Sequence, residues 1–354
     1  MPWDLFAQVV DNHGDVGFSW RLAADLAGRG ETVRLWLDDR SALSWMAPRG
    51  VPGVSLGSWR DAVAAGPAEV VIETFGCGLP DGYALQMAHR TPAPVWIDVE
   101  YLSAEAYVER SHGLPSPRTL SDGSVLTQWY FYPGFTSSTG GLVREPGLLA
   151  RRDRFERAPW LADRLGLAAV PMPQERVVSL FCYDNPKLPN LLDTLAATPT
   201  LLLVTRGAAT HQVERLLGAG RRRGALRALM LPLLDQPDYD RLLWASDLNL
   251  VRGEDSFVRA QWAGAPFLWQ IYPQADHAHV RKLDAFLDLH LQTAQPGLQS
   301  GVRAAFRAWN SMGAWHDLPA QDAWRELCRD WRDRLAAGCD LAASLQTFAR
   351  ARTL

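Results

Sequence analysis

One segment of the chain decides the fold, SDLNLVRGEDSFVRAQWAGAPFLWQIYP at residues 246–273. Its pattern predicts a buried strand over 247–253, a short polar loop, a helix from Ser256, and a Gly-x-Pro step into a second strand over 266–273. A strand, a crossover helix and another strand form a βαβ unit, in which the two strands run parallel. The segment therefore predicts a parallel sheet with helices packed on its faces.

The same alternation of strands and helices runs through both halves of the chain. The predicted strands lie at 5–10, 32–37, 69–75 and 93–102 in the first half, and at 176–183, 200–207, 225–234, 247–253 and 266–273 in the second. Prolines around 158–176 mark a linker. We predict an N-terminal Rossmann-like domain (1–160), a linker (161–175), a C-terminal Rossmann-like domain (176–335) and a final helix (336–354) that can pack back on the first domain. Two doubly wound halves would place a cleft at the carboxyl ends of both sheets.

Two polar, Gly- and Pro-rich stretches follow the fourth predicted strand, SHGLPSPRTLSDGS (111–124) and YPGFTSSTGGLVRE (132–145). They are too long for a simple connection, and long loops in compact domains are usually functional or disordered. Both stretches are therefore candidate functional loops.

Composition excludes several classes of protein. With 354 residues and 47% hydrophobic residues the chain can form two cores, and a formal charge of -3 gives no general attraction to nucleic acid or to an anionic membrane. Short basic runs at 150–157 and 221–223 are typical of solvated helix surfaces. No secretory segment and no apolar run of membrane-spanning length is present, so the cytoplasm is expected.

The four cysteines are scattered without a CxxC pair, which argues against a disulfide framework and a zinc site. The stretch DHAHV (276–280) contains metal-ligating residue types but reads as the start of a helix. We therefore expect no bound metal.

The first loop, DNHGDVG at 11–17, lies where a dinucleotide fingerprint would lie, between a strand and a helix. It lacks G-x-G-x-x-G, and the carboxylates of Asp11 and Asp15 would repel a diphosphate. A functional Asp here would act as a general base or hold a cationic acceptor group. The alternative is structural, since Asp15 is also well placed to cap the helix.

The loop RGEDS at 252–256 is suited to bind an anionic group. The order of strand, loop and helix resembles the donor half of glycosyltransferases with the two-domain GT-B fold. Backbone N–H groups at a helix start favour a phosphate, and Arg252 supplies a fixed cationic fork. Glu254 could accept hydrogen bonds from two ribose hydroxyls. Alternatively, Glu254, Asp255 and Ser256 only begin the helix.

Longer motifs resemble one family, the elongation factor P arginine rhamnosyltransferases (EarP family). They are VVDNHGDVGFSWRLA, VWIDVEYLSAE, HGLPSP, FYPGFTSSTGGLVRE, VSLFCY, LPLLDQPDYDRLLWASDLNLVRGEDSFVRAQWAGAPFLWQIYPQ and KLDAFL. The match is collinear to about residue 290. It implies a GT-B fold of two Rossmann-like domains facing each other across a cleft. It also implies inverting transfer of L-rhamnose from dTDP-β-L-rhamnose to an arginine guanidinium of translation elongation factor P, with no metal and no further cofactor.

The resemblance also assigns roles to residues. It makes Asp15 the general base, with Asp11 as its companion, and it gives Glu254 a part in both donor binding and catalysis. The implied donor contacts are Tyr183, Arg252, Gly253, Glu254, Asp255, Ser256, Phe257, Leu234 and Gln236. The loop 231–236 would meet the thymine, but Leu233 stands where relatives commonly have an aromatic residue. His13 stands where they often have Tyr or Phe.

Two other classes of function fit the same scaffold. One is an enzyme with a small substrate, either a nucleotide-sugar epimerase or a small-molecule glycosyltransferase. The other is a module that binds a translation factor or a nucleotide without catalysis. For a protein of the EarP family, the expected partners are elongation factor P and dTDP-rhamnose, with neither nucleic acid nor a membrane.

Overall fold

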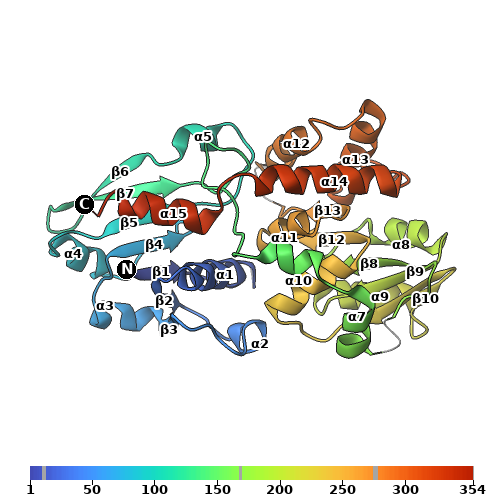
Figure 1. Cartoon of the computed structure of the whole chain (residues 1–354), viewed down its shortest axis with the longest axis horizontal. Coiled ribbons are helices and arrows are strands. Elements are labelled where there is room, and N and C mark those ends of the chain that lie inside the picture. The colour runs from blue at the N-terminus through green and yellow to red at the C-terminus, as the bar shows by residue number, and fades with distance from the viewer. Residues whose placement is uncertain (10–12, 167–169, 274–277, 354) are drawn as a thin grey trace. The chain divides into compact units, whose positions relative to one another are not determined.

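The computed structural model describes residues 1–9, 13–166, 170–273 and 278–353 (Figure 1). The chain divides into two compact units, unit 1 (Met1–Leu148 with Leu335–Leu354) and unit 2 (Leu149–Arg334). Each unit is built on one sheet with helices around it. No helix among the described residues is both long and apolar enough to cross a membrane.

The division between the units falls after Leu148, whereas the sequence placed the end of the first domain at 160. The reason is helix α7 (Arg157–Leu165), which buries Leu161 against Val177 and Leu201 in the core of unit 2. The segment expected to end the first domain therefore belongs to the second.

Unit 1 contains a seven-stranded sheet in the order β3-β2-β1-β4-β5-β7-β6, which is parallel except for β6. The inner order 3-2-1-4-5 is that of a doubly wound fold. The strands are β1 (Pro2–Ala7), β2 (Thr32–Leu37), β3 (Val54–Ser58), β4 (Val70–Thr74), β5 (Val95–Val99), β6 (Pro115–Thr119) and β7 (Val125–Phe131). The helices are α1 (Gly14–Gly28), α2 (Leu43–Met46), the 3-10 helix η1 (Trp59–Asp61), α3 (Ala62–Ala65), α4 (Tyr83–Ala88), α5 (Tyr107–Ser111) and α15 (Leu341–Arg350), and α6 (Leu148–Asp153) lies at the division.

Both faces of this sheet are covered. On one face, apolar residues of α1 and α15, such as Leu22 and Leu345, pack with Leu5 and Ile72 of the strands. On the other, Tyr83 and Met87 of α4 pack against alternate strand residues such as Phe6. The alternation of the side chains along each strand produces these two layers.

The polar stretch after β5 forms part of the sheet, which corrects the expectation of a long functional or disordered loop. Residues 115–131 form a β-hairpin, β6 and β7, closed by a turn in which Gly123 has a φ of 85°. β6 contains Pro115 and Pro117, which cannot donate backbone hydrogen bonds, and it lies at the edge of the sheet. Proline is tolerated at an edge, where it also discourages pairing with another chain.

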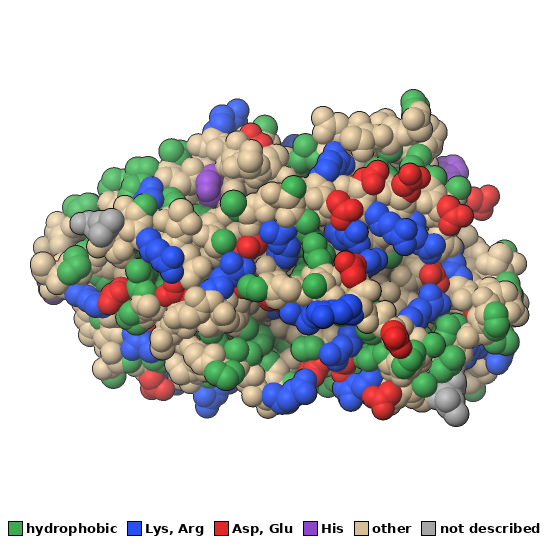
Figure 2. All heavy atoms as spheres, in the orientation of Figure 1, with side chains coloured by type: hydrophobic (Ala, Val, Ile, Leu, Met, Phe, Trp, Pro, Cys, Tyr) green, Lys and Arg blue, Asp and Glu red, His purple; other side chains and the backbone are tan. Residues whose placement is uncertain are grey.

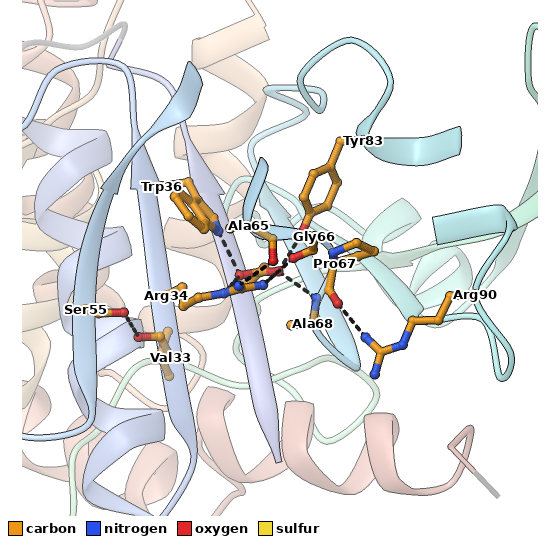
Figure 3. A network of polar contacts seen from close by, with 11 residues as sticks. Val33, Arg34, Trp36, Ser55, Ala65, Gly66, Pro67, Ala68, Tyr83 and Arg90 are labelled. Atoms are coloured by element: carbon orange, nitrogen blue, oxygen red, sulfur yellow. Dashed lines mark hydrogen bonds and ion pairs between the residues drawn. The ribbon is translucent and has the colours of Figure 1, made fainter. Parts of the chain in front are cut away.

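A buried carboxylate anchors the middle of β1. Asp4 is fully buried and accepts two hydrogen bonds of 2.6 Å from the Arg34 guanidinium and one of 2.7 Å from Trp36 Nε1. The Tyr83 hydroxyl and the Ala68 N–H also donate to it. Figure 3 shows these donors converging from β2, α4 and the loop before β4. A buried charge with so many donors is a structural element of unit 1.

Unit 2 contains a six-stranded sheet in the order β10-β11-β9-β8-β12-β13, parallel except for the short edge strand β10. Its strands are β8 (Arg176–Leu180), β9 (Thr200–Val204), β10 (Arg222–Arg223), β11 (Leu226–Met230), β12 (Leu248–Arg252) and β13 (Phe267–Gln270). Its helices, besides α7, are α8 (Leu188–Ala196), α9 (Ala208–Leu217), α10 (Gln236–Ala245), α11 (Asp255–Ala263), α12 (Ala278–His290), α13 (Pro296–Trp309) and α14 (Gln321–Ala336).

The basic runs of the sequence lie on the surface among carboxylates. Arg223 pairs with Asp193 at 2.8 Å, and Arg157 pairs with Asp247 at 3.1 Å. On the face shown in Figure 2, basic and acidic side chains are interspersed. Such pairs contribute little to stability individually, and they balance the local charge.

Candidate active site

The predicted donor residues of unit 2 gather at one edge of its sheet. Tyr183 follows β8, the loop 231–236 follows β11, and Arg252 ends β12 and is followed by Gly253 and Glu254. In the sheet order, β8 pairs directly with β12 and only β9 separates it from β11. The carboxyl ends of parallel strands meet at one edge, where open α/β sheets bind their ligands. The fold therefore brings these loops to a single edge.

Aromatic rings support the guanidinium of Arg252. Its Cζ lies 4.3 Å from the ring centroid of Tyr183 and 4.5 Å from that of Phe181. Tyr183 in turn contacts Tyr272, and Phe181 contacts Tyr239, both edge to face. The faces of aromatic rings attract a guanidinium electrostatically and restrict its orientation. Arg252 is thus a positioned cation at the carboxyl edge of the sheet.

The first turn of α11 begins at Asp255, after Gly253 and Glu254, which follow this cation. Glu254 is the N-cap residue, and its side chain makes no capping hydrogen bond. The Ser256 hydroxyl donates to the carbonyl of Arg252, and Trp269 Nε1 donates to the carbonyl of Gly253 at 2.8 Å. The loop is therefore held by Ser256 and Trp269. Glu254, Asp255 and Ser256 do begin the helix, and the Glu254 side chain does so without a capping hydrogen bond.

The loop that carries Tyr183 is fixed by two glutamine side chains. Gln270 Oε1 accepts from the Tyr183 N–H at 2.9 Å, and Gln212 Nε2 donates to the Tyr183 carbonyl at 3.1 Å. Both glutamines are more than nine-tenths buried. Buried amides with both groups engaged hold a backbone firmly. Tyr183 therefore has little freedom beside Arg252.

The remaining predicted donor residues differ in exposure. Leu233 is 43% exposed, Leu234 is half-buried, and Gln236 is buried at the start of α10. Phe257 is only 1% exposed, and its ring stacks on Trp269 with centroids 3.9 Å apart. The Phe257 ring therefore belongs to the core of unit 2, so a donor would reach its backbone and not its ring.

In unit 1 the carboxyl edge carries Asp15. It lies in the first turn of α1 and is 5% exposed. The N-cap residue of α1 is His13, whose side chain makes no capping hydrogen bond; it is exposed and meets Trp45 edge to face. Asp15 is thus not the N-cap that the structural alternative required. Asp11 lies outside the described residues.

Two further carboxyl groups lie at this edge, on neighbouring strands. Glu73 of β4 and Asp98 of β5 are direct cross-strand partners. Burial, together with the charge of Asp98, raises the pKa of Glu73 to about 7. Trp96 Nε1 and Gln128 Nε2 donate to Glu73 at 2.5 and 2.9 Å, and the Gly76 N–H donates to Asp98 at 3.1 Å. These contacts fix the loop that follows β4.

Sequence reasoning missed several residues of both edges. In unit 2 they are Phe181, Tyr239, Tyr272, Gln212 and Gln270; in unit 1 they are Glu73 and Asp98. Phe181 and Tyr272 fall inside the predicted strands 176–183 and 266–273, whereas the observed strands end before them at Leu180 and Gln270. The glutamines bind backbone atoms, which no motif shows. Among the described residues, no group of three His, Cys, Asp or Glu side chains is arranged to hold a metal ion.

Comparison with known proteins gives consistent results along the whole chain. A family model described as "Elongation-Factor P (EF-P) rhamnosyltransferase EarP" matches residues 3–350. A protein-arginine rhamnosyltransferase of Pseudomonas putida is 44% identical, covering 98% of both chains. One similar solved structure, described as "Structural basis for EarP-mediated arginine glycosylation of translation elongation factor EF-P", has a TM-score of 0.69 and 34% identity over 99% of each chain.

A second solved structure, the glycosyltransferase VinC in complex with dTDP, has a TM-score of 0.52 and covers 99% of each chain. At 13% identity it shows the fold alone. Together these similarities confirm the predicted GT-B fold with its two Rossmann-like units.

Proposed function

The chain belongs to the EarP family of elongation factor P rhamnosyltransferases, and from this premise we propose that it transfers L-rhamnose from dTDP-β-L-rhamnose to an arginine guanidinium of translation elongation factor P. It is a glycosyltransferase. The transfer inverts the anomeric centre and takes place in the cytoplasm, where translation factors act.

The acceptor side of the reaction requires a carboxylate. A guanidinium is delocalised and stays protonated at physiological pH, with a pKa above about 12, so it is a poor nucleophile. Asp15 lies at the carboxyl edge of unit 1, is nearly buried and lies beyond the N-cap. It would bind the guanidinium, align one nitrogen with the anomeric carbon and accept its proton as the C–N bond forms. Asp11 would assist it.

The donor side requires positive charge. As the glycosidic C–O bond breaks, negative charge grows on the diphosphate and the sugar becomes oxocarbenium-like. Arg252 and the backbone N–H groups of the first turn of α11 would stabilise that charge, and Glu254 would take the ribose hydroxyls. With this arrangement no metal and no further cofactor is needed, and dTDP-rhamnose is the only small-molecule substrate.

The observation that carries this proposal is the support of Arg252 on Phe181 and Tyr183 beside a helix start whose N-cap carboxylate makes no capping bond. Arg252 lies at the carboxyl edge of the sheet among these aromatic rings, where a cation suits an anionic ligand.

The test is direct. The protein is incubated with dTDP-rhamnose and purified elongation factor P, and the intact mass of the factor is measured. We expect a gain of one deoxyhexose, which fragmentation places on an arginine. If the factor gains no mass while the sugar nucleotide changes its stereochemistry, the epimerase reading is correct. If both compounds bind without change, the protein is a binding module.

A further inference from the structure

A row of aromatic rings leads along the carboxyl edge of unit 1, away from the proposed base. Phe18 lies one helical turn after Asp15 in α1 and packs on Phe75, with ring centroids 5.0 Å apart. Phe75 stacks on Tyr101 at 4.2 Å, with the two rings 8° from parallel. Phe75 follows β4 and Tyr101 follows β5, so the row crosses two neighbouring strand ends. It links the base to a surface beyond it.

Phe75 holds its place in this row at an energetic cost. Its φ is 61°, a left-handed conformation that is unfavourable for a bulky residue. The buried carboxyl of Asp98 accepts from the N–H of the next residue, Gly76, and the Cys77 thiol contacts the Phe6 carbonyl at 3.4 Å. Strained residues that persist in this way gather at ligand-binding sites. The strain orients the ring that supports Tyr101.

The row ends at the surface among tyrosines and carboxylates. Tyr101 is 44% exposed and Tyr107 is 42% exposed, although most of a folded domain's tyrosine rings are largely covered. Tyr107 meets Tyr132 edge to face at 5.8 Å. Glu100, next to Tyr101, raises the pKa of both Tyr107 and Tyr132 by its charge, in addition to the effect of burial. We call Tyr101, Tyr107, Tyr132 and Glu100 the tyrosine surface.

The chemistry of this surface favours a cation. The faces of tyrosine rings are electron-rich and attract Lys or Arg, and a neighbouring carboxylate adds to this attraction. Glu105, which also raises the pKa of Tyr107, increases the negative charge. The nearby cation Arg118 is engaged, because it donates to Gln128 Oε1 at 2.7 Å and to the Tyr130 hydroxyl at 3.3 Å. A phosphate or a carboxylate ligand would be repelled here.

We propose that the tyrosine surface binds a cationic side chain of the acceptor protein, distinct from the arginine that is modified, by stacking it on Tyr101 beside Glu100. Phe18 and Phe75 separate Tyr101 from Asp15, so the two sites take different side chains of one acceptor segment. The inference rests on the proposed function, since it adds a docking contact to the same transfer. Such a contact makes the enzyme select a protein segment instead of any free guanidinium.

The experiment measures rhamnose transfer to purified elongation factor P at varied acceptor concentration, with the full-length chain. Tyr101→Ala is expected to raise the acceptor KM about tenfold and to leave kcat and dTDP affinity within about twofold. Tyr101→Phe, which keeps the ring, is expected to restore the wild-type KM. Glu100→Gln is expected to raise the acceptor KM by about threefold and to reduce its dependence on salt.

Leu56→Ala is the matched control, because Leu56 is 41% exposed on the edge strand β3 of the same sheet. It should leave the acceptor KM unchanged. An unchanged acceptor KM in Tyr101→Ala overturns the inference, as does a rise in the donor KM instead, which would place the sugar on Tyr101. A wild-type protein that neither binds nor modifies the factor, by calorimetry and mass, overturns the proposed function itself.

Discussion

The two units contain the same local construction, but unit 2 places an arginine at the end of its strand. In unit 1 a strand, β1, leads through a loop into α1, whose first turn carries Asp15; in unit 2 a strand, β12, leads into α11 directly after Arg252. Both helices start at the carboxyl edge of a doubly wound sheet, where the helix dipole favours an anion. Unit 2 places the cation of Arg252 at the strand end, ahead of the carboxylates of Glu254 and Asp255, whereas the first turn of α1 in unit 1 carries Asp15. The same construction can thus serve an anionic leaving group or a cationic acceptor.

Unit 1 also shows that the position of a carboxylate decides its role. Asp4 lies in the middle of β1 and is fully buried with Arg34, Trp36 and Tyr83 as donors. Asp15 belongs to the same strand–helix unit but lies at the edge where ligands bind. A buried carboxylate with a full set of donors has no capacity for a substrate, so Asp4 is not suited to the reaction that is proposed for Asp15.

The largest expected effect comes from removing the charge of Asp15. Asp15→Asn keeps the shape of the side chain and cannot accept a proton, so kcat for transfer should fall on the order of 10²- to 10⁴-fold. The affinity for dTDP, measured by calorimetry, should not change, because the proposed dTDP site lies in unit 2. Asp122→Asn, an exposed aspartate in the turn between β6 and β7 of the same unit, is the control. Unchanged transfer in Asp15→Asn would remove the base assignment.

The next effect concerns the cation of unit 2. Arg252→Ala should weaken dTDP binding on the order of 10- to 100-fold, because it removes charge-assisted hydrogen bonds to the diphosphate. Arg252→Lys should recover only part of the loss, since an ammonium cannot replace the planar fork stacked on Tyr183 and Phe181. Arg222→Ala, an exposed arginine on the edge strand β10 of the same unit, serves as the control. Equal dTDP affinity in Arg252→Ala and wild type would place the diphosphate elsewhere.

The order of strands and helices in each unit could be predicted from the sequence, but the contacts between residues far apart in the sequence could not. The strand predicted at 32–37 is β2 to the residue, whereas the strand predicted at 5–10 is in fact Pro2–Ala7. Asp4 caused that shift, because an aspartate looks out of place in a buried strand until Arg34 of the next strand is seen beside it. Pro115 and Pro117 hid β6 in the same way, since only an edge position admits them.

The parts of the candidate site that follow from neighbouring residues in the sequence could be predicted. The segments after β8, β11 and β12 could be placed at one sheet edge by the βαβ rule alone. The burial of the Phe257 ring could not be predicted in this way, because it depends on contacts with Trp269 and Phe286, which lie in later elements. The aromatic support of Arg252 likewise requires the pairing of β8 with β12, which separate stretches of sequence do not reveal.

A smaller effect should follow from adding an aromatic ring to the loop after β11. Leu233 is 43% exposed at the edge where the thymine is proposed to lie. Leu233→Phe should tighten dTDP binding by about fivefold, because base–aromatic stacking is worth about 1–3 kcal/mol per base and an exposed ring realises part of it. Met172→Phe, at an exposed site of the same unit, is the control. A loss of affinity in Leu233→Phe would mean that the base binds elsewhere.

The smallest expected effect is that of chelation. If Arg252 and the first turn of α11 supply the positive charge that the diphosphate needs, EDTA should leave the transfer rate unchanged and added Mg²⁺ should change it by less than about twofold. The measurement is most informative in Arg252→Ala. Partial rescue of that variant by Mg²⁺ would show that the site accepts a cation in place of the guanidinium, whereas a wild-type protein inactivated by EDTA would mean that a metal ion, and not Arg252, distinguishes unit 2 from unit 1.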